Sequence, residues 1–347
     1  MGNPVLVEVT RGPRVESWHR GAVAVVDADG RPVLALGDVE RPVYPRSAIK
    51  PIQALPLVES GAADRFGLGA EELALACASH GGEPGHVATA TRMLQCSGLD
   101  PSALKCGAHW PIHQPSAQAL MRAGEQPSPL HNNCSGKHAG FLCVACALDA
   151  DRTRYTEPAH PVQRLVKAAL ADLACAAIGE DMCAIDGCSA PTWALPLLSL
   201  ARAFARFGTG RGLSSERAQA AARLRAACAE HPWHVAGSGR FCTEIMRHFG
   251  TRLLVKSGAE GVVCAALPGE GLGIAVKCDD GASRAAEVMM AATAASLFRA
   301  DADQAALQPY LRPALRNWNG ITVGTIRPSG ALARDALAPA QGVRTDP

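Results

Sequence analysis

The character of this chain changes at Tyr44-Pro45-Arg46-Ser47-Ala48-Ile49-Lys50-Pro51, where short strand-like apolar runs give way to helical patterns. Pro45 is typical of a helix start, and Pro51 is tolerated only within the first turns. Residues three apart share one face of a helix, so a helix starting here would place the Ser47 hydroxyl beside the Lys50 amine. A serine hydroxyl is a poor nucleophile at neutral pH, and a neutral lysine amine can take its proton. The stretch therefore predicts a serine nucleophile with a lysine base.

The spacing alone is not specific, because Ser102 and Lys105 repeat it elsewhere in the chain. The use of lysine is more informative. Of 34 basic residues only six are lysine, at positions 50, 105, 137, 167, 256 and 277. Arginine cannot lose its proton in a protein, so a chain this rich in arginine indicates that a lysine is kept where a neutral amine is needed. Lys50, Lys137 and Lys256 all stand in short contexts rich in serine and glycine.

Composition sets the class of protein. The chain has 347 residues, 48% of them hydrophobic, which is enough for a full core. A formal net charge of +2, spread along the chain, does not favour nucleic acid or an anionic membrane as a partner. No secretion signal or membrane-spanning run is visible, and the 13 cysteines predict reduced thiols in the cytoplasm. The pair Cys143 and Cys146 lies in an apolar run and fits a helix core better than a redox motif.

The order of elements predicts an α+β fold. Strands are expected at 5–9, 21–27 and 32–36, then at 252–256, 262–267, 271–277 and 321–326. Helices are expected at 71–78, 86–95, 138–148, 161–178, 192–207, 215–229 and 282–299. Strands from both ends of a chain can share one antiparallel sheet, against which a helical middle region packs. We therefore expect a single domain at 1–328, with a sheet from about 1–45 and 250–328, a helical part at about 46–249, and a flexible tail at 329–347.

Four further stretches place polar residues in turns between regular elements, where sites are commonly found. They are Ala78-Ser79-His80-Gly81-Gly82-Glu83, Leu130-His131-Asn132-Asn133-Cys134-Ser135-Gly136-Lys137-His138, Ile185-Asp186-Gly187-Cys188-Ser189-Ala190-Pro191 and Leu253-Leu254-Val255-Lys256-Ser257-Gly258-Ala259-Glu260-Gly261. A strand that runs into Lys-Ser-Gly, downstream of a Ser-x-x-Lys helix start, is similar to the motif set of penicillin-recognising serine enzymes.

Together these stretches closely resemble the Rhizobium-type, cysteine-rich L-asparaginases, and the run from Asn132 to His138 is the most specific of them. The resemblance covers nearly the whole chain, to about Pro328. It implies the fold of the serine β-lactamases and glutaminases, hydrolysis of L-asparagine to L-aspartate and ammonia, and a homodimer.

The resemblance also implies the roles of individual residues. Two serine–lysine pairs, Ser47 with Lys50 and Ser79 with Lys256, are expected around one catalytic site, with zinc at Cys134, Lys137 and Cys188. The implied substrate-binding residues are Cys134, Lys137, His138, Asp186 and Glu260. The resemblance leaves open which serine attacks, and the helix-start geometry favours Ser47. Two thiolates and one amine form an unusual zinc set, since sulfur and imidazole are the common ligands.

Two other functions stay open on the sequence. One is a penicillin-recognising type of serine amidohydrolase, or a glutaminase. The other is a protein that binds zinc or an amino acid without catalysis, in which Ser47 and Lys50 are structural. Such a protein would bind asparagine without releasing ammonia, whereas the penicillin-recognising alternative predicts covalent labelling of Ser47 by penicillin.

Overall fold

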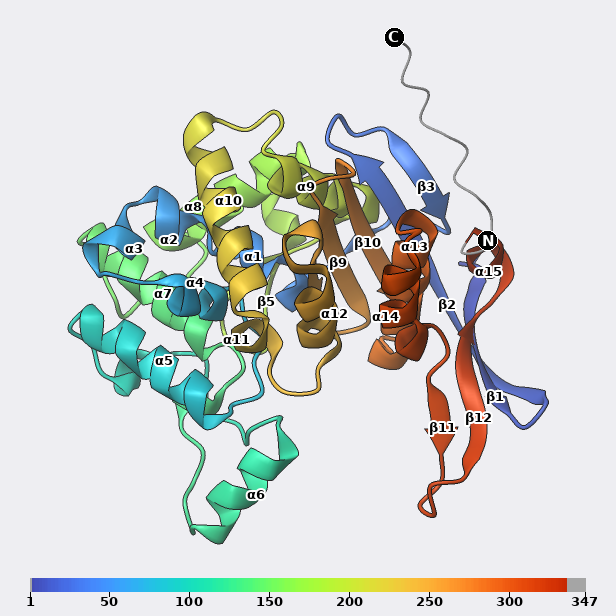
Figure 1. The fold of residues 1–347 in the computed structure, drawn as a ribbon. Coiled ribbons are helices and arrows are strands. Elements are labelled where there is room, and N and C mark those ends of the chain that lie inside the picture. The colour runs from blue at the N-terminus through green and yellow to red at the C-terminus, as the bar shows by residue number, and fades with distance from the viewer. Residues whose placement is uncertain (1, 336–347) are drawn as a thin grey trace.

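The structure is a computed structural model and describes residues 2–335. Its centre is an eight-stranded antiparallel sheet built from both ends of the chain (Figure 1). In order across the sheet, the strands are β11 (Ala314–Arg316), β12 (Thr322–Pro328), β1 (Val5–Arg11), β2 (Arg14–Asp27), β10 (Leu272–Cys278), β9 (Val262–Leu267) and β8 (Leu254–Ser257), with β3 (Pro32–Leu36) also paired to β2. The predicted α+β class, with its sheet from the two ends of the chain, is confirmed.

Strand β2 joins the two halves of this sheet. Its first half, from Arg14 to Arg20, pairs with β1, and its second half, from Gly21 to Asp27, pairs with β10. The second half is apolar and almost wholly buried, as expected for a strand covered on both faces.

Two helices cover opposite faces of the sheet. A Cβ atom on Gly273 would lie 2.0 Å from Ala201 O, so only glycine lets helix α9 (Leu197–Thr209) approach β10 so closely. Gly21 points to the other face, where it approaches Met289 of helix α13 (Ser283–Leu297). The sheet is thus the middle layer, as Figure 1 shows.

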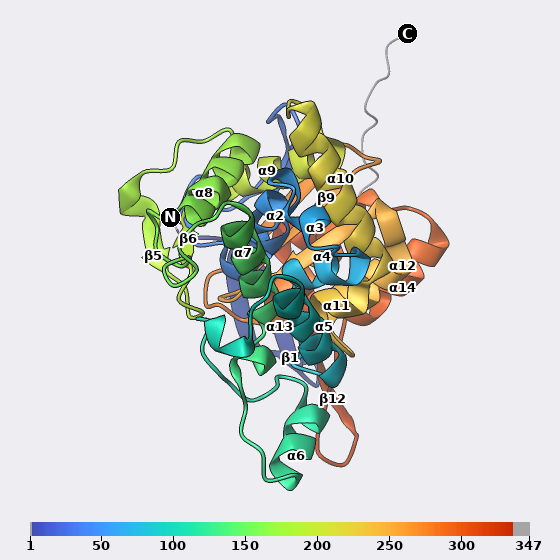
Figure 2. The same cartoon turned by 90° about the vertical axis from the view of Figure 1, so that its left-hand side faces the viewer.

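The helical middle region is centred on α7 (Ser135–Ala147), which is apolar on all sides and buried over most of its length. Figure 2 shows α7 surrounded by neighbouring helices, while α6 projects from the body. The other helices are α1 (Lys50–Gln53), α2 (Leu55–Glu59), α3 (Ala62–Arg65), α4 (Ala70–Ala76), α5 (Pro84–Cys96), α6 (Gln114–Arg122), α8 (Pro161–Ala174), α10 (Ser215–Glu230), α11 (Pro232–Ala236), α12 (Phe241–Phe249), α14 (Asp301–Leu311) and α15 (Gly330–Asp335). Short 3-10 turns are η1 (Arg46–Ile49), η2 (Pro101–Ala103), η3 (Pro129–His131), η4 (Glu180–Met182) and η5 (Gly250–Arg252).

Several predicted boundaries were wrong, among them the start of β2, which lies at Arg14 and not at residue 21. The helix expected from Thr192 begins only at Leu197, because residues Pro191–Trp193 form strand β6, which pairs with β5 (Cys183–Ile185). A second short pair joins β4 (Pro42–Val43) to β7 (Leu195–Pro196). Helix α8 ends at Ala174, four residues earlier than expected, where Cys175 takes a left-handed conformation.

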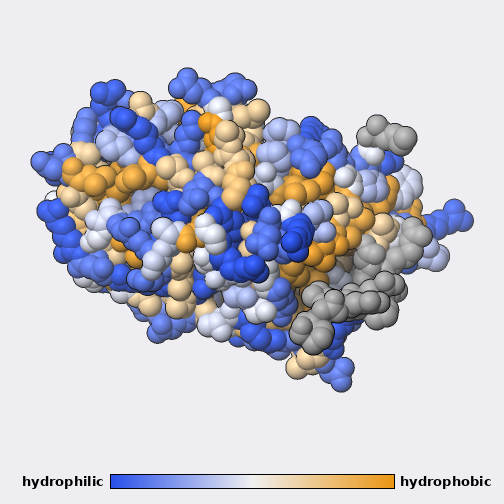
Figure 3. All heavy atoms as spheres, turned by 90° about the horizontal axis from the view of Figure 1, so that it is seen from above, coloured by the Kyte–Doolittle hydropathy of each residue, from blue (hydrophilic) through white to orange (hydrophobic). Residues whose placement is uncertain are grey.

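The tail expected from residue 329 begins instead with helix α15, whose Leu332 is buried and which packs against β1 and α13. The rest of the predicted tail, residues 336–347, lies outside the described residues. Within residues 2–335, no helix has the length and apolar character needed to cross a membrane. The face seen from above is largely hydrophilic, with apolar residues showing in bands between the polar ones (Figure 3).

Candidate active site

Lys50 lies where turn η1 passes into helix α1, and it is 1% exposed. Its amine donates three hydrogen bonds, to Ala78 O at 2.5 Å, Ser79 Oγ at 3.0 Å and Asn133 O at 3.2 Å. A lysine ammonium has three N–H donors and no acceptor. Because each of the three has an oxygen partner, the surroundings of Lys50 are those of a charged ammonium.

Lys256 reaches the same serine from the sheet. It lies on β8, is 1% exposed, and donates to Ser79 Oγ at 2.9 Å and to Ser257 O at 2.7 Å. Burial lowers the pKa of Lys256 to about 7, and the positive charge of Lys50 acts in the same direction. Lys256 is therefore the amine that can be neutral near physiological pH.

Ser79 is held between these two amines. It follows helix α4, and its N–H donates to Val235 O at 2.9 Å. Ser79 and Ser47 line one cavity of about 210 Å³, together with Asn133 and Arg240, which the sequence did not single out. Both serines thus reach the same space, at the seam between sheet and helical region.

The predicted pair of Ser47 with Lys50 is not formed. Within residues 2–335, no hydrogen bond joins the Ser47 hydroxyl to Lys50, whose amine reaches Ser79 instead. Residues three apart share a face in the 3-10 turn Arg46–Ile49 as well, but all three donors of the Lys50 amine are taken by Ala78 O, Ser79 Oγ and Asn133 O. The helix start therefore gives Ser47 no lysine base, and the structure does not favour Ser47 as the nucleophile.

The Lys-Ser-Gly motif has a packing reason as well as a chemical one. A Cβ atom on Gly258 would lie 2.6 Å from Pro45 O and 2.9 Å from Ala48 N. Only glycine allows the end of β8 to rest against turn η1. This contact fixes the distance between the strand that carries Lys256 and the turn that carries Ser47.

The three predicted zinc ligands lie together under the cavity. Cys134, Lys137 and Cys188 are each at most 5% exposed, and Lys137 Nζ lies 3.0 Å from Cys188 Sγ. A hydrogen bond with Cys188 lowers the pKa of Cys134, helped by the charges of Lys50 and Lys137. Burial disfavours the charge of Lys137, but the two thiols outweigh it and raise the pKa of its amine. The donor set of two sulfurs and one nitrogen fits zinc, provided that the metal displaces the Lys137 proton.

A second group of metal-ligand side chains was not predicted from the sequence. His19 Nδ1 lies 2.6 Å from Asp280 Oδ2, and Cys278 donates to the other carboxylate oxygen of Asp280 at 2.9 Å. These three residues belong to the far end of β10 and to β2, so they lie outside the serine cavity. They already satisfy one another by hydrogen bonds.

Asp186 lies beside the zinc-ligand cluster and is bound by Arg46 at 2.7 Å. Burial raises its pKa, but the Arg46 hydrogen bond and the charge of Lys137 outweigh this and lower it. Asp186 is therefore a carboxylate near neutral pH. Arg46 was not predicted as a site residue, although it precedes Ser47 directly, because an arginine beside a serine has no distinctive spacing.

The other two predicted substrate ligands lie away from the serines. His138 is fully buried, bonds Tyr155 OH through Nδ1 at 2.7 Å, and has its pKa lowered to about 4 by burial. Glu260 lines a neighbouring, larger pocket. Neither is among the described residues that line the serine cavity. The other three substrate ligands implied by the resemblance, Cys134, Lys137 and Asp186, do not line this cavity either, so the role of all five stays a prediction.

Comparison with known proteins identifies the family. The family model described as L-asparaginase II matches residues 7–328, which confirms the resemblance seen in the motifs. No curated protein matches the chain.

Solved structures with related folds are only distantly similar. A structure described as Mglu in its glutamate form is 14% identical, with a TM-score of 0.38, over 75% of this chain and 56% of that one. A β-lactamase from Mycobacterium bovis is 17% identical, with a TM-score of 0.40, over 84% of this chain and 94% of that one. A putative β-lactamase from Bacteroides dorei is 14% identical, with a TM-score of 0.39, over 74% of this chain and 84% of that one. The chain thus spans little more than half of the first of these proteins.

Proposed function

We propose that this chain, which belongs to the L-asparaginase II family, hydrolyses L-asparagine to L-aspartate and ammonia through an acyl-enzyme on Ser79. The family supports an asparaginase-type amidohydrolase. The observation that supports the choice of serine is that two buried lysine amines donate to one hydroxyl, that of Ser79. This replaces the initial preference for Ser47.

In this mechanism Lys256 acts as the base. Its neutral amine takes the proton of Ser79 Oγ, and the oxygen forms a bond to the side-chain amide carbon of asparagine. The proton on Lys256 passes to the amide nitrogen as the C–N bond breaks, so ammonia leaves and an ester on Ser79 remains. Lys256 then takes a proton from water, which attacks the ester, and aspartate leaves as the proton returns to Ser79.

Lys50 supplies a fixed positive charge throughout. Its three hydrogen bonds hold the ammonium 3.0 Å from Ser79 Oγ, where negative charge develops when the serine is deprotonated. The same charge keeps the pKa of Lys256 low. The backbone N–H groups of Gly82 and Ser135 already have partners, His80 Nδ1 and Asn132 O, so we do not assign the oxyanion to them.

The rest of the proposal concerns binding. We assign the α-ammonium group of asparagine to Asp186, a carboxylate that Arg46 holds beside the zinc-ligand cluster; neither residue lines the serine cavity itself. Zinc would be held by Cys134, Lys137 and Cys188, where it would supply a positive charge that orients the substrate. We further propose a cytoplasmic homodimer, as expected of the family.

The deciding experiment measures ammonia release with asparagine, glutamine and buffer alone, in the wild type and in Ser79→Ala and Ser47→Ala. We expect release from asparagine above glutamine, a loss of at least about 1000-fold in Ser79→Ala, and a smaller loss in Ser47→Ala. Mass spectrometry of acid-quenched enzyme should find the acyl group on the peptide that contains Ser79. An acyl group on the Ser47 peptide would refute the assignment, and tight asparagine binding without ammonia would refute the enzyme. Faster turnover of glutamine or of nitrocefin would favour the alternatives raised by the sequence.

A further inference from the structure

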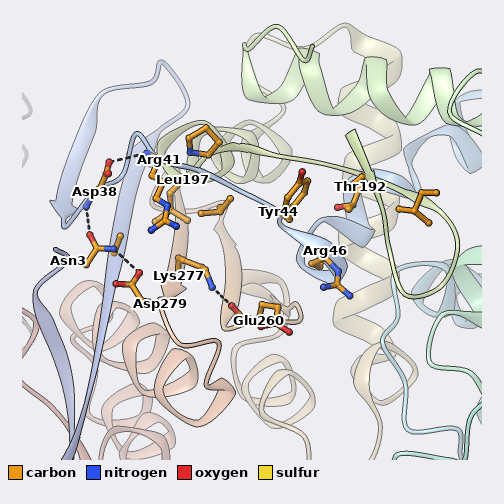
Figure 4. Close-up of a pocket in the computed structure, with 15 residues that line it drawn as sticks. Asn3, Asp38, Arg41, Tyr44, Arg46, Thr192, Leu197, Glu260, Lys277 and Asp279 are labelled. Atoms are coloured by element: carbon orange, nitrogen blue, oxygen red, sulfur yellow. Dashed lines mark hydrogen bonds between the residues drawn. The ribbon is translucent and has the colours of Figure 1, made fainter. Parts of the chain in front are cut away.

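A second pocket, about 440 Å³ in volume, has Arg46 as one of its lining residues (Figure 4). It is twice as large as the serine cavity and lies within the size range of small-molecule sites. Neither catalytic serine lines it. Its walls come from β4, β6, β10 and the start of α9, so it opens on the α9 face of the sheet.

One part of the wall is apolar. Val43, Tyr44 and Leu197 line the pocket. In Figure 4 the Tyr44 ring lies between Arg41, at one end of the pocket, and Thr192, at the other. Tyr44 is exposed even though it lies beside buried residues. An apolar side chain of a ligand would be buried against these residues.

The pocket also holds charged groups that have spare bonding capacity. The Lys277 amine donates to Glu260 O at 2.5 Å and to Cys278 O at 2.7 Å, which leaves one of its three N–H donors free. Within residues 2–335, the Arg41 guanidinium and the Glu260 carboxylate have no hydrogen-bond or ion-pair partner. Two cations and one carboxylate therefore line the same space with capacity to bind a ligand.

The remaining carboxylates of the pocket are already engaged. Asp279 accepts from the Asn3 side-chain amide at 2.8 Å, and Asp38 accepts from the Arg41 backbone N–H at 3.1 Å. This leaves Glu260 as the carboxylate best placed to receive a cation from a ligand.

Thr192 gives an independent indication of a ligand. It lines the pocket, is only 3% exposed, and its Oγ1 has no hydrogen-bond partner among the residues that the structure describes. A buried hydroxyl without a partner is costly, so such groups usually contact water or a ligand. Figure 4 shows Thr192 at the Arg46 end of the pocket, across Tyr44 from Arg41.

We infer that this pocket binds a free α-amino acid with an apolar side chain, at a site separate from the serine cavity. The ligand carboxylate is recognised by Arg41 and Lys277, and its ammonium group by Glu260. The apolar side chain lies against Tyr44 and Leu197, with the Thr192 hydroxyl as a further hydrogen-bonding group. A zwitterion matches a wall that carries both signs of charge better than a simple anion or cation does.

The test is calorimetric titration of L-phenylalanine into the full chain carrying Ser47→Ala and Ser79→Ala, so that no turnover occurs. We expect saturable binding of one equivalent per chain that is unchanged by excess L-asparagine. Phenethylamine lacks the carboxylate and 3-phenylpropionate lacks the ammonium, so each should bind at least about tenfold more weakly. Displacement of L-phenylalanine by L-asparagine would place it in the serine cavity and overturn the inference.

Variants of the pocket sharpen the test. Arg41→Gln should weaken L-phenylalanine binding about tenfold and Thr192→Val several-fold, while both keep the wild-type Tm. Arg14→Gln, an exposed cation on the β1–β2 hairpin, is the matched control and should bind as the parent does. No binding up to about 20 mM, or equal binding in Arg41→Gln, would refute the inference. Sedimentation that shows a dimer lost specifically in Arg41→Gln would also overturn it, because the pocket would then be a contact between two copies of this chain.

Discussion

Lys256 should give the pH–rate profile of this enzyme an acid limb with an apparent pKa of about 7. The proposed mechanism needs the neutral amine, because only that form can take the proton of Ser79. The group is therefore active above its pKa and inactive below it. At pH 5, two units below the pKa, only about 1% of the amine is neutral, so kcat/KM should be about 100-fold below its plateau.

Two substitutions separate Lys256 from other groups that titrate in this range. Lys256→Arg keeps a positive charge that cannot be lost, so kcat/KM should fall by about 100-fold to 10,000-fold at all pH values. Lys50→Met removes the charge that helps to lower the pKa of Lys256. In that variant the acid limb should move to higher pH, whatever happens to the plateau rate.

The assay is ammonia release from L-asparagine between pH 5 and 9, with unfolding monitored by circular dichroism at each pH. A profile that stays flat from pH 5 to pH 8 would refute the role of Lys256 as base. So would an acid limb that stays in place in Lys50→Met, or a Lys256→Arg variant that keeps more than about a tenth of the wild-type kcat/KM.

Four further outcomes follow from the geometry. The wild type should become more stable between pH 7 and pH 9.5, because in this range unfolded Lys256 holds a proton that folded Lys256 has lost. This rise should be smaller in Lys256→Met, as measured by Tm at the two pH values. Gly258→Ala should abolish turnover and lower Tm, since its Cβ atom would collide with Pro45 O, and a wild-type Tm would contradict the packing argument. Arg46→Gln should raise KM about tenfold with little change in kcat, because Asp186 loses its partner; an unchanged KM would remove Asp186 from substrate binding. Zinc affinity should fall steeply between pH 8 and pH 6 and be lost in Cys134→Ser, as measured by competition with a chelator; pH-independent affinity would exclude the thiol and amine ligands.

The sequence predicted the broad plan because that plan depends on local patterns. Strand-type runs at both ends and helical periods between them are read from residues near one another in the chain. The boundaries that were wrong depend on distant partners: residues Pro191–Trp193 form a strand because β5 is available to pair with them. Helix α15 likewise exists where Leu332 finds a place in the core, which the local sequence does not show.

The same difference between local patterns and distant partners decides which residues of the candidate site could be predicted. Lys50 and Lys256 could be singled out because lysine is scarce in a chain rich in arginine. Their shared partner could not be predicted, because the Lys50 amine meets Ser79 only where the folded chain brings residues 29 positions apart together. Arg46 was missed for a related reason, since its importance lies in Asp186, which is 140 residues away.

We propose different roles for the two lysines because their hydrogen bonds differ, although both are buried to the same extent. Three oxygen partners compensate the burial of a charged Lys50, whereas Lys256 has only two and lies close to that charge. A single buried lysine beside a serine would have to be both the base and the positive charge that stabilises the deprotonated oxygen, and one amine cannot be neutral and charged at the same time. Two lysines on one hydroxyl remove this conflict, because the proposed mechanism uses Lys50 as the positive charge, and that charge helps to lower the pKa of Lys256. Ser47 has no such pair of amines, which is why the proposed chemistry is placed at Ser79.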